Sequence, residues 1–99
     1  MRIKDSVRIS GISPEAVLAV IVANSVFSEI KKDCVITSVT DGDHMEGSLH
    51  HAGFAFDLRT RHLEPEERIL SVKKLRERLG PAFDVLLEDT HIHVEYDPE

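Results

Sequence analysis

Most of the histidines of this chain, and the carboxylates best spaced to join them, lie in two short stretches about forty residues apart. The first, Ser48–Asp57, carries two histidines and one glycine and ends on an aspartate. The second, Glu88–His93, carries two acids and two histidines, so the two stretches together hold four of the six histidines. Imidazole nitrogens and carboxylate oxygens are the ligands that zinc takes from proteins, together with thiolates. The composition of the two stretches therefore predicts a metal site.

Strand periodicity predicts that the polar side chains of the two stretches share one face of a sheet. In the strand expected at His91–Tyr96, a period of two places His91, His93 and Glu95 on one side and the apolar residues on the other. Asp57 alternates with the phenylalanines of its own strand, so it faces away from the core as well. Both stretches therefore present their ligand-type residues to the same side.

Two imidazoles, one carboxylate and an open fourth position make a zinc site of the catalytic type. His50 stands in the loop before Asp57, where Gly53 gives the backbone freedom to turn it inward. A zinc ion lowers the pKa of a bound water to about 7 and polarises a carbonyl group. Such a site needs a carboxylate as general base, which Glu88 or Asp89 can supply. Of the other histidines, we interpret His44 and His62 as surface residues.

Composition limits the classes of protein to consider. The chain has 99 residues, which corresponds to one domain over 1–99. Its net charge is −6 and its sequence shows no clustered Lys/Arg face, which argues against a role in nucleic-acid binding. The apolar run Ala16–Val22 is too short to span a membrane and begins too late for a signal peptide. We expect a protein that is cytoplasmic as synthesised. Cys34, the lone cysteine, is interpreted as a buried apolar residue.

The remaining sequence predicts the elements that position these residues. Ser13-Pro14 starts a helix that runs to about Lys31, and Pro65 starts a second one that ends at Gly80-Pro81. The strands are expected at Arg2–Ile9, Cys34–Val39, Phe54–Thr60, Phe83–Leu87 and His91–Tyr96, the last two joined as a hairpin. This order predicts an α+β fold, with a largely antiparallel sheet and helices packed on one face.

Periodicity also predicts the buried sides of these elements. The inward positions expected of the first strand are Ile3, Val7 and Ile9. Those of the first helix are Val17, Val20, Ile21, Asn24, Phe27 and Ile30, and its wide apolar surface predicts cover on more than one side. Those of the second helix are Ile69, Val72, Leu75 and Leu79.

The motif Ser48-x-His50-x-x-Gly53-x-Ala55-x-Asp57, followed by His91-x-His93, resembles the zinc D-Ala-D-Ala carboxypeptidase and dipeptidase family. Phage peptidoglycan endopeptidases and the hedgehog signalling domain share that family's fold. The resemblance covers roughly residues 35–96 and implies an antiparallel sheet flanked by helices. It implies that one zinc ion is held by His50, Asp57 and His93. It also implies that His91 lies beside the metal, close to the substrate or the oxyanion, and that Ser48 lies on the substrate side.

The chain departs from this family at two positions. Active members carry an acid three residues before the last zinc histidine, where this chain has Thr90; Glu88 and Asp89 lie five and four residues before His93. An arginine that would hold a substrate carboxylate is missing from the segment Thr37–Gly42. The second departure argues against carboxypeptidase action on a free terminus.

The resulting expectation is a zinc metallopeptidase that cleaves an amide bond in peptidoglycan stem peptides, as a D,D-carboxypeptidase or an endolysin-type endopeptidase. Glu88 would carry the proton and His91 would stabilise the oxyanion. The small size suggests a phage or prophage enzyme that reaches the cell wall by a phage-type route. The alternative is a non-catalytic zinc domain of the same fold, in which the ion stabilises the fold or a binding surface.

Overall fold

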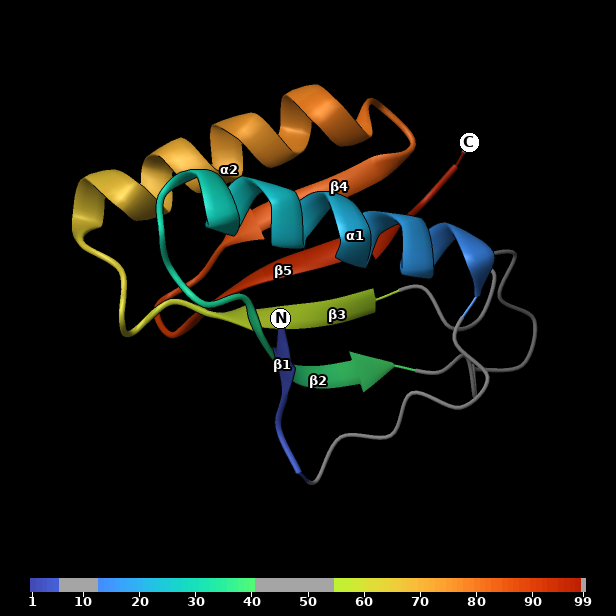
Figure 1. The fold of residues 1–99 in the computed structure, drawn as a ribbon. Coiled ribbons are helices and arrows are strands. Elements are labelled where there is room, and N and C mark those ends of the chain that lie inside the picture. Colours follow the sequence, from blue (N-terminus) through green and yellow to red (C-terminus); the bar gives the residue numbers. More distant parts are fainter. Residues whose placement is uncertain (6–12, 41–54, 99) are drawn as a thin grey trace.

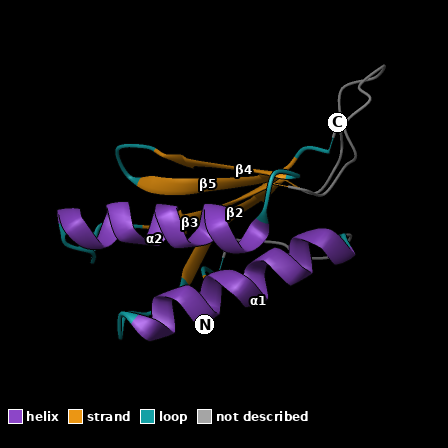
Figure 2. Ribbon diagram, turned by 90° about the horizontal axis from the view of Figure 1, so that it is seen from above, coloured by secondary structure: helices purple, strands orange, loops and turns teal. Residues whose placement is uncertain are grey.

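Two helices pack against one face of a five-stranded sheet (Figure 1). The structure is a computed structural model that describes residues 1–5, 13–40 and 55–98. Its elements are β1 (Arg2–Ile3), α1 (Pro14–Glu29), β2 (Val35–Thr40), β3 (Ala55–Arg59), α2 (Pro65–Leu79), β4 (Phe83–Leu87) and β5 (His91–Tyr96). Seen from above, both helices lie on the same side of the strands (Figure 2). The predicted α+β fold, with helices on one face of a mostly antiparallel sheet, is confirmed.

The strand order in the sheet is β1-β2-β3-β5-β4. All neighbouring pairs are antiparallel except β1, which joins β2 in parallel. β4 and β5 form the predicted hairpin, whose turn is closed by a 2.8 Å hydrogen bond from the Glu88 N–H to the His91 carbonyl. The first strand is shorter than predicted, because β1 ends at Ile3. Ile3, expected to face inward, is 36% exposed, while Val7 and Ile9 lie outside the described residues.

Alternation along β3 and β5 separates a buried face from a polar one, as predicted. Phe56 and Leu58 of β3 are buried, as are Ile92 and Val94 of β5. These side chains meet the helices and form the core together with Val85 of β4. The residues between them in sequence therefore point to the opposite, helix-free side of the sheet, which we call the outer face.

α1 begins as the sequence predicts. The Ser13 hydroxyl accepts a 3.0 Å hydrogen bond from the Ala16 N–H, and Pro14 occupies the first turn, where its missing N–H costs nothing. The helix ends at Glu29, two residues before the predicted end, and Lys31 adopts a left-handed conformation with φ of 60°. The chain thus turns toward β2 before the two lysines can extend the helix.

The predicted buried side of α1 is partly wrong. Val20 and Phe27 are buried, but Val17 and Ile21 are 43% and 60% exposed. The buried residues are Ala16, Ala19, Val20, Ala23, Val26 and Phe27. Alanines permit the closest approach of the helix backbone to its neighbours, so the core takes the stripe of small residues. α1 contacts both α2 and β5, but the exposed positions, Leu18 among them, show that these neighbours do not cover its whole apolar surface.

α2 follows its prediction more closely. The Glu67 carboxylate accepts a 2.8 Å hydrogen bond from the Glu64 N–H and so stabilises the first turn. Val72 and Leu75 are buried as predicted, whereas Ile69 is 65% exposed and does not belong to the core. The helix ends at Gly80, whose φ of 82° favours glycine.

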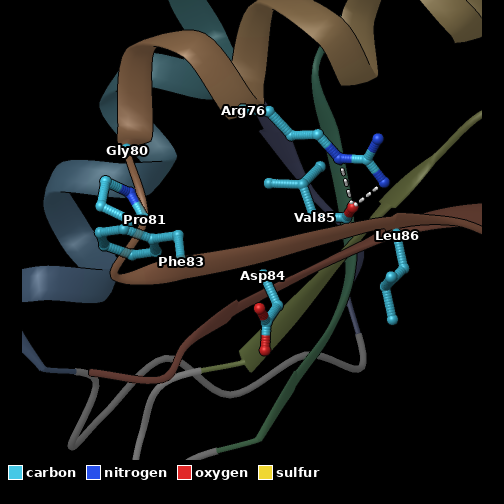
Figure 3. A pocket seen from close by; sticks show the side chains of 7 residues that line it. All are labelled: Arg76, Gly80, Pro81, Phe83, Asp84, Val85 and Leu86. Atoms are coloured by element: carbon cyan, nitrogen blue, oxygen red, sulfur yellow. Dashed lines mark hydrogen bonds between the residues drawn. The ribbon is translucent and has the colours of Figure 1, made fainter. Parts of the chain in front are cut away.

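Arg76 attaches α2 to the edge strand β4. Its Nε and Nη2 donate hydrogen bonds of 3.0 and 2.7 Å to the Val85 carbonyl (Figure 3). A cavity of about 390 Å³ lies beside this contact, lined by Arg76, Gly80, Pro81, Phe83, Asp84, Val85 and Leu86. The Val85 carbonyl thus accepts its hydrogen bonds from a side chain. This edge strand therefore has one free backbone acceptor fewer with which to pair with a strand of another chain.

Within the described residues no helix is long and apolar enough to cross a membrane.

An ion-pair cluster joins the end of α1 to α2. The Glu29 carboxylate contacts Lys74 Nζ and Arg78 Nη1, each at 2.7 Å. Hydrogen bonds from Arg78 and then Lys74 lower the pKa of Glu29 from 4.5 to about 2. Because Glu29 is charged at every ordinary pH, this contact ties the two helices together on the surface.

We predict that Glu29→Gln lowers the thermal unfolding temperature at neutral pH. A carboxyl whose pKa is depressed by folding stabilises the protein above its unfolded pKa of 4.5, and this contribution disappears as the pH falls through about 2. The deficit of the variant should therefore shrink between these pH values, as measured by circular dichroism melts. Asp89→Asn, which removes the same charge from an exposed position on the β4–β5 turn, is the control. A deficit independent of pH would contradict an electrostatic role.

We predict that Cys34 reacts slowly with thiol reagents in the folded protein. The side chain is buried, as expected from the sequence, and this burial raises its pKa from 9.0 to about 11. The thiolate is the reactive form, so its fraction at pH 8 is about a hundredfold smaller than that of an ordinary thiol. Reaction with a chromogenic disulfide reagent should proceed only after unfolding in guanidinium. Rapid labelling under native conditions would show that Cys34 is accessible.

Candidate metal centre

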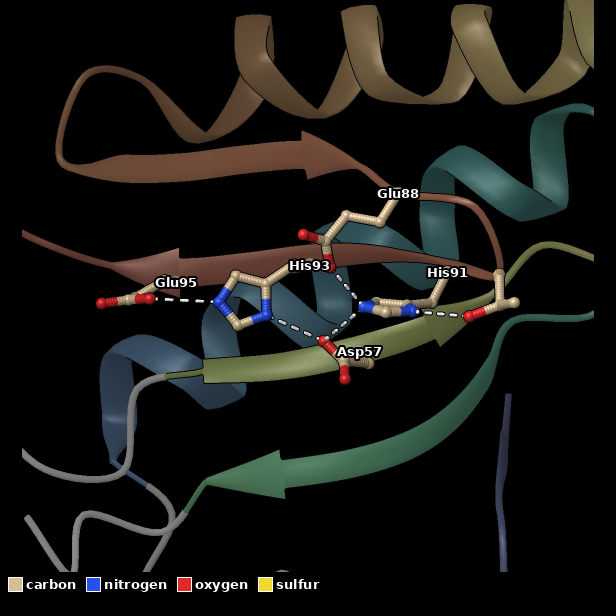
Figure 4. Close-up of polar contacts among 6 residues, drawn as sticks. Asp57, Glu88, His91, His93 and Glu95 are labelled. Atoms are coloured by element: carbon tan, nitrogen blue, oxygen red, sulfur yellow. Dashed lines mark hydrogen bonds and ion pairs between the residues drawn. The ribbon is translucent and has the colours of Figure 1, made fainter.

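Asp57 and His93 face each other on the outer face of the sheet. They are register partners on the neighbouring strands β3 and β5, although 36 residues separate them in sequence. Asp57 Oδ1 lies 2.8 Å from His93 Nδ1 (Figure 4). The two side chains are 22% and 27% exposed, so the contact is open to solvent on one side. The antiparallel register thus brings together two of the three expected zinc ligands.

The second ring nitrogen of His93 is also engaged. Glu95, two residues further along the same face, places Oε1 3.1 Å from His93 Nε2. Burial of the ring lowers the pKa of His93, but the hydrogen bonds to Glu95 and Asp57 outweigh it, and the pKa is raised overall. A protonated ring donates from Nε2 to Glu95 and from Nδ1 to Asp57, whereas a neutral imidazole has a single N–H and can donate to only one of them. Glu95 thus contacts the imidazole ring of His93, an interaction that the sequence analysis did not predict.

His91 lies next to this pair on the same face. Its Nε2 is 2.6 Å from Glu88 Oε1 and 3.7 Å from Asp57 Oδ1 (Figure 4). The Thr90 hydroxyl lies 2.9 Å from the other ring nitrogen, Nδ1. If the hydroxyl donates to Nδ1, the ring proton sits on Nε2, where it can be donated to an oxygen.

The geometry of the β4–β5 turn shows which of the two candidate acids, Glu88 or Asp89, lies beside the histidines. Glu88 and His91 face each other across the turn formed by Asp89 and Thr90, since the Glu88 N–H donates to the His91 carbonyl. Their side chains therefore emerge on the same face of the hairpin. Asp89 is an exposed turn residue, and in the described part of the chain the ion pairs of the cluster involve Glu88, Asp57 and Glu95 but not Asp89. The structure brings Glu88, rather than Asp89, to the candidate site.

The facing side-chain atoms of Asp57 and His93 are of the kinds that bind zinc. One carboxylate oxygen and one imidazole nitrogen converge, and the two are 2.8 Å apart. Two such ligands of a tetrahedral zinc ion are separated by roughly 3.3 Å, since each lies about 2.0–2.2 Å from the metal. A side-chain movement of about half an ångström would therefore admit the ion between them. Asp57 and His93 fit the role that the resemblance implies.

The remaining expected residues lie in a part of the chain that the structure does not describe. His50, the third predicted ligand, and Ser48, the predicted substrate-side residue, lie outside the described residues, as does His44. Within the described part of the chain, no group of three or more His, Cys, Asp or Glu side chains is placed to hold a metal ion. His62 takes no part in the cluster; it is half-buried beside Phe27, and its Nε2 lies 2.7 Å from the Asp33 carbonyl oxygen.

We predict that His93→Ala and Asp57→Ala each weaken zinc binding by at least about a hundredfold. Loss of a partner that only orients a ligand costs about 10–100-fold in metal affinity, so the loss of a ligand should cost at least as much. Affinity is measured by competition with a chromogenic chelator, and His62→Ala is the control histidine variant. Unchanged affinity in either test variant would remove that residue from the set of ligands.

The chain was compared with protein-family models, with curated proteins and with solved structures, and nothing matches in any of the three. The function is therefore inferred from the residues of the site and from the motif in which they stand.

Proposed function

We propose that this chain is a zinc metallopeptidase that cleaves an amide bond in peptidoglycan stem peptides, as a D,D-carboxypeptidase or an endolysin-type endopeptidase. The observation that carries the proposal is the pairing of Asp57 with His93, with His91 and Glu88 beside them on one open face. His50, Asp57 and His93 are the proposed ligands of a single zinc ion. Peptidoglycan or a short peptide derived from it is the proposed partner.

Zinc, when bound, lowers the pKa of water and polarises the carbonyl of the scissile amide. Glu88 is proposed as the general base, which takes a proton from the attacking water and returns it to the leaving amine nitrogen. His91 Nε2 is proposed to donate a hydrogen bond to the carbonyl oxygen as negative charge develops there. The 2.6 Å contact between the two residues keeps them adjacent to each other and to Asp57.

A second candidate is a non-catalytic zinc domain of the same fold. The observation that favours it is the contact between Glu88 and His91, which occupies the proposed base in the absence of a substrate. The absence of an arginine from Thr37–Gly42 points the same way. A purely structural zinc site, however, uses four protein ligands, whereas the motif here offers three and leaves one position open.

We predict that Glu88→Gln lowers the rate of peptidoglycan cleavage by about 10²–10⁴-fold, which is the usual contribution of general acid–base catalysis. Zinc affinity should remain unchanged, because Glu88 is not a proposed ligand. The measurement is release of amino groups from purified cell wall by zinc-loaded protein, with and without a chelator. Asp89→Asn, which removes the neighbouring charge on the turn, is the matched control and should retain activity.

Two outcomes would contradict the proposal at different levels. Full activity in Glu88→Gln would overturn the assignment of the base. No cleavage of several wall chemistries by folded, zinc-loaded wild-type protein would favour the non-catalytic domain.

A further inference from the structure

The outer face carries a second feature, a basic cavity that neither the motif nor the proposed mechanism uses. This cavity of about 290 Å³ is lined by Arg2, Ile3, Lys4, Asp5, Val35 and Arg59. Three cations stand there against one carboxylate, in a chain whose net charge is −6. A cleft lined by an excess of positive charge raises the local concentration of anions, so an anionic ligand is favoured there.

The register places this cavity beside the candidate metal centre. Arg59 is the partner of His91 across β3 and β5, and it alternates with Leu58, which is buried on the helix side. Arg59 therefore shares the outer face with Asp57. On the other side, Ile36 pairs with Leu58, so Val35 follows next to Arg59, and Arg2 pairs with Val35. One row across the sheet thus connects the basic cavity directly to His91.

Backbone hydrogen bonds attach the segment that carries Arg2 and Lys4 to β2, and among the described residues the cations of the cavity have few acidic partners. The N–H groups of Arg2 and Lys4 donate to the carbonyls of Cys34 and Ile36, at 2.7 and 2.9 Å. Among the described residues, Arg2 forms one ion pair, with the exposed Asp33 carboxylate at 3.4 Å. For Arg59 and Lys4, no carboxylate of the described residues lies within ion-pair distance. Two cations of the cavity are therefore available to an anion.

The opposite end of the same face is acidic. Asp84 and Glu95 are register partners on β4 and β5, and Asp84 also forms a side-chain hydrogen bond with Asp97. An anionic group is repelled at this end and attracted at the other. A substrate that lies across His93 and His91 is thereby oriented with its negative group toward Arg59.

We propose that the cavity around Arg59 and Lys4 is an anion subsite that binds a carboxylate of the substrate. This inference rests on the proposed function and specifies its substrate class, a peptide that carries a carboxylate on the Arg59 side of the scissile amide. The planar guanidinium of Arg59 can bind both carboxylate oxygens, and the Lys4 ammonium adds a second charge. The carboxylate can be the C-terminal one or that of an acidic side chain, since both present the same group.

Binding of two matched pairs of short stem-type peptides tests this subsite. The first pair differs only in a C-terminal carboxylate against a carboxamide. The second pair has a carboxamide terminus and differs only in a glutamate against a glutamine side chain. Affinities are measured by calorimetry with zinc-loaded and zinc-free protein, so that the result does not depend on cleavage.

We expect the carboxylate form of one pair to bind at least about tenfold more tightly, since hydrogen bonds to a charged group contribute at that level. The pair that shows the preference identifies the source of the carboxylate. Arg59→Gln should abolish most of the preference, and Lys4→Gln should reduce it. Arg61→Gln removes the same charge two residues further along, outside the cavity, and should leave the preference intact.

The inference is overturned if neither pair shows a preference, if the preference survives in Arg59→Gln, or if Arg61→Gln loses it equally. A second readout does not depend on the folding of a variant: the Arg59 Nε–H resonance of the wild-type protein should shift on addition of the preferred peptide. Absence of that shift also overturns the subsite. Peptide binding without wall cleavage would contradict the proposed function and leave the subsite standing, so the two failures are distinguishable.

Discussion

The antiparallel register between β3 and β5 is the constraint on which both the core and the candidate site depend. It sets Phe56 opposite Val94 on the helix side and Asp57 opposite His93 on the outer side. A slip of one residue in either strand would exchange its faces, burying a carboxylate or an imidazole against the helices and exposing the apolar residues. Burial of an unpaired charge costs several kcal/mol, so the apolar core and the polar pair select the same register. The site is thus fixed by the same pairing that holds the fold together.

The helices support this sheet from one side and leave the other side open. α1 and α2 cover the apolar face, and Arg76 and the cluster around Glu29 connect α2 to β4 and to α1. Because no described element covers the outer face, the side chains that line it remain half-exposed. A rigid, one-sided support of this kind suits chemistry on an extended substrate, which needs access along the strands and precise placement of a few side chains.

Sequence patterns predicted the parts that depend on strong local signals. The helix start at Ser13-Pro14, the strand at His91–Tyr96 and its polar face were all predicted, because capping and a period of two leave few alternatives. The buried side of α1 was not, since the helix is apolar around most of its circumference and only contact with the sheet selects the alanine stripe. The basic cavity was missed for another reason. Arg2 and Arg59 are distant in sequence, and only the pairing of β1 with β2 and of β2 with β3 places them in one row.

The position of Glu88 shows why distance along the chain is a poor guide to reach in a hairpin. Counted from His93, Glu88 is five residues away and Asp89 four, so spacing alone does not show which acid reaches the histidines. In a two-residue turn, however, the residue before the turn lies opposite the residue after it, and the two turn residues point outward. The backbone bond between Glu88 and His91 therefore sets the farther acid on the face of the histidines. The turn thus brings Glu88 to within 2.6 Å of His91 although it is the acid farther from His93 in sequence, and this contact is the physical reason for proposing Glu88 as the general base.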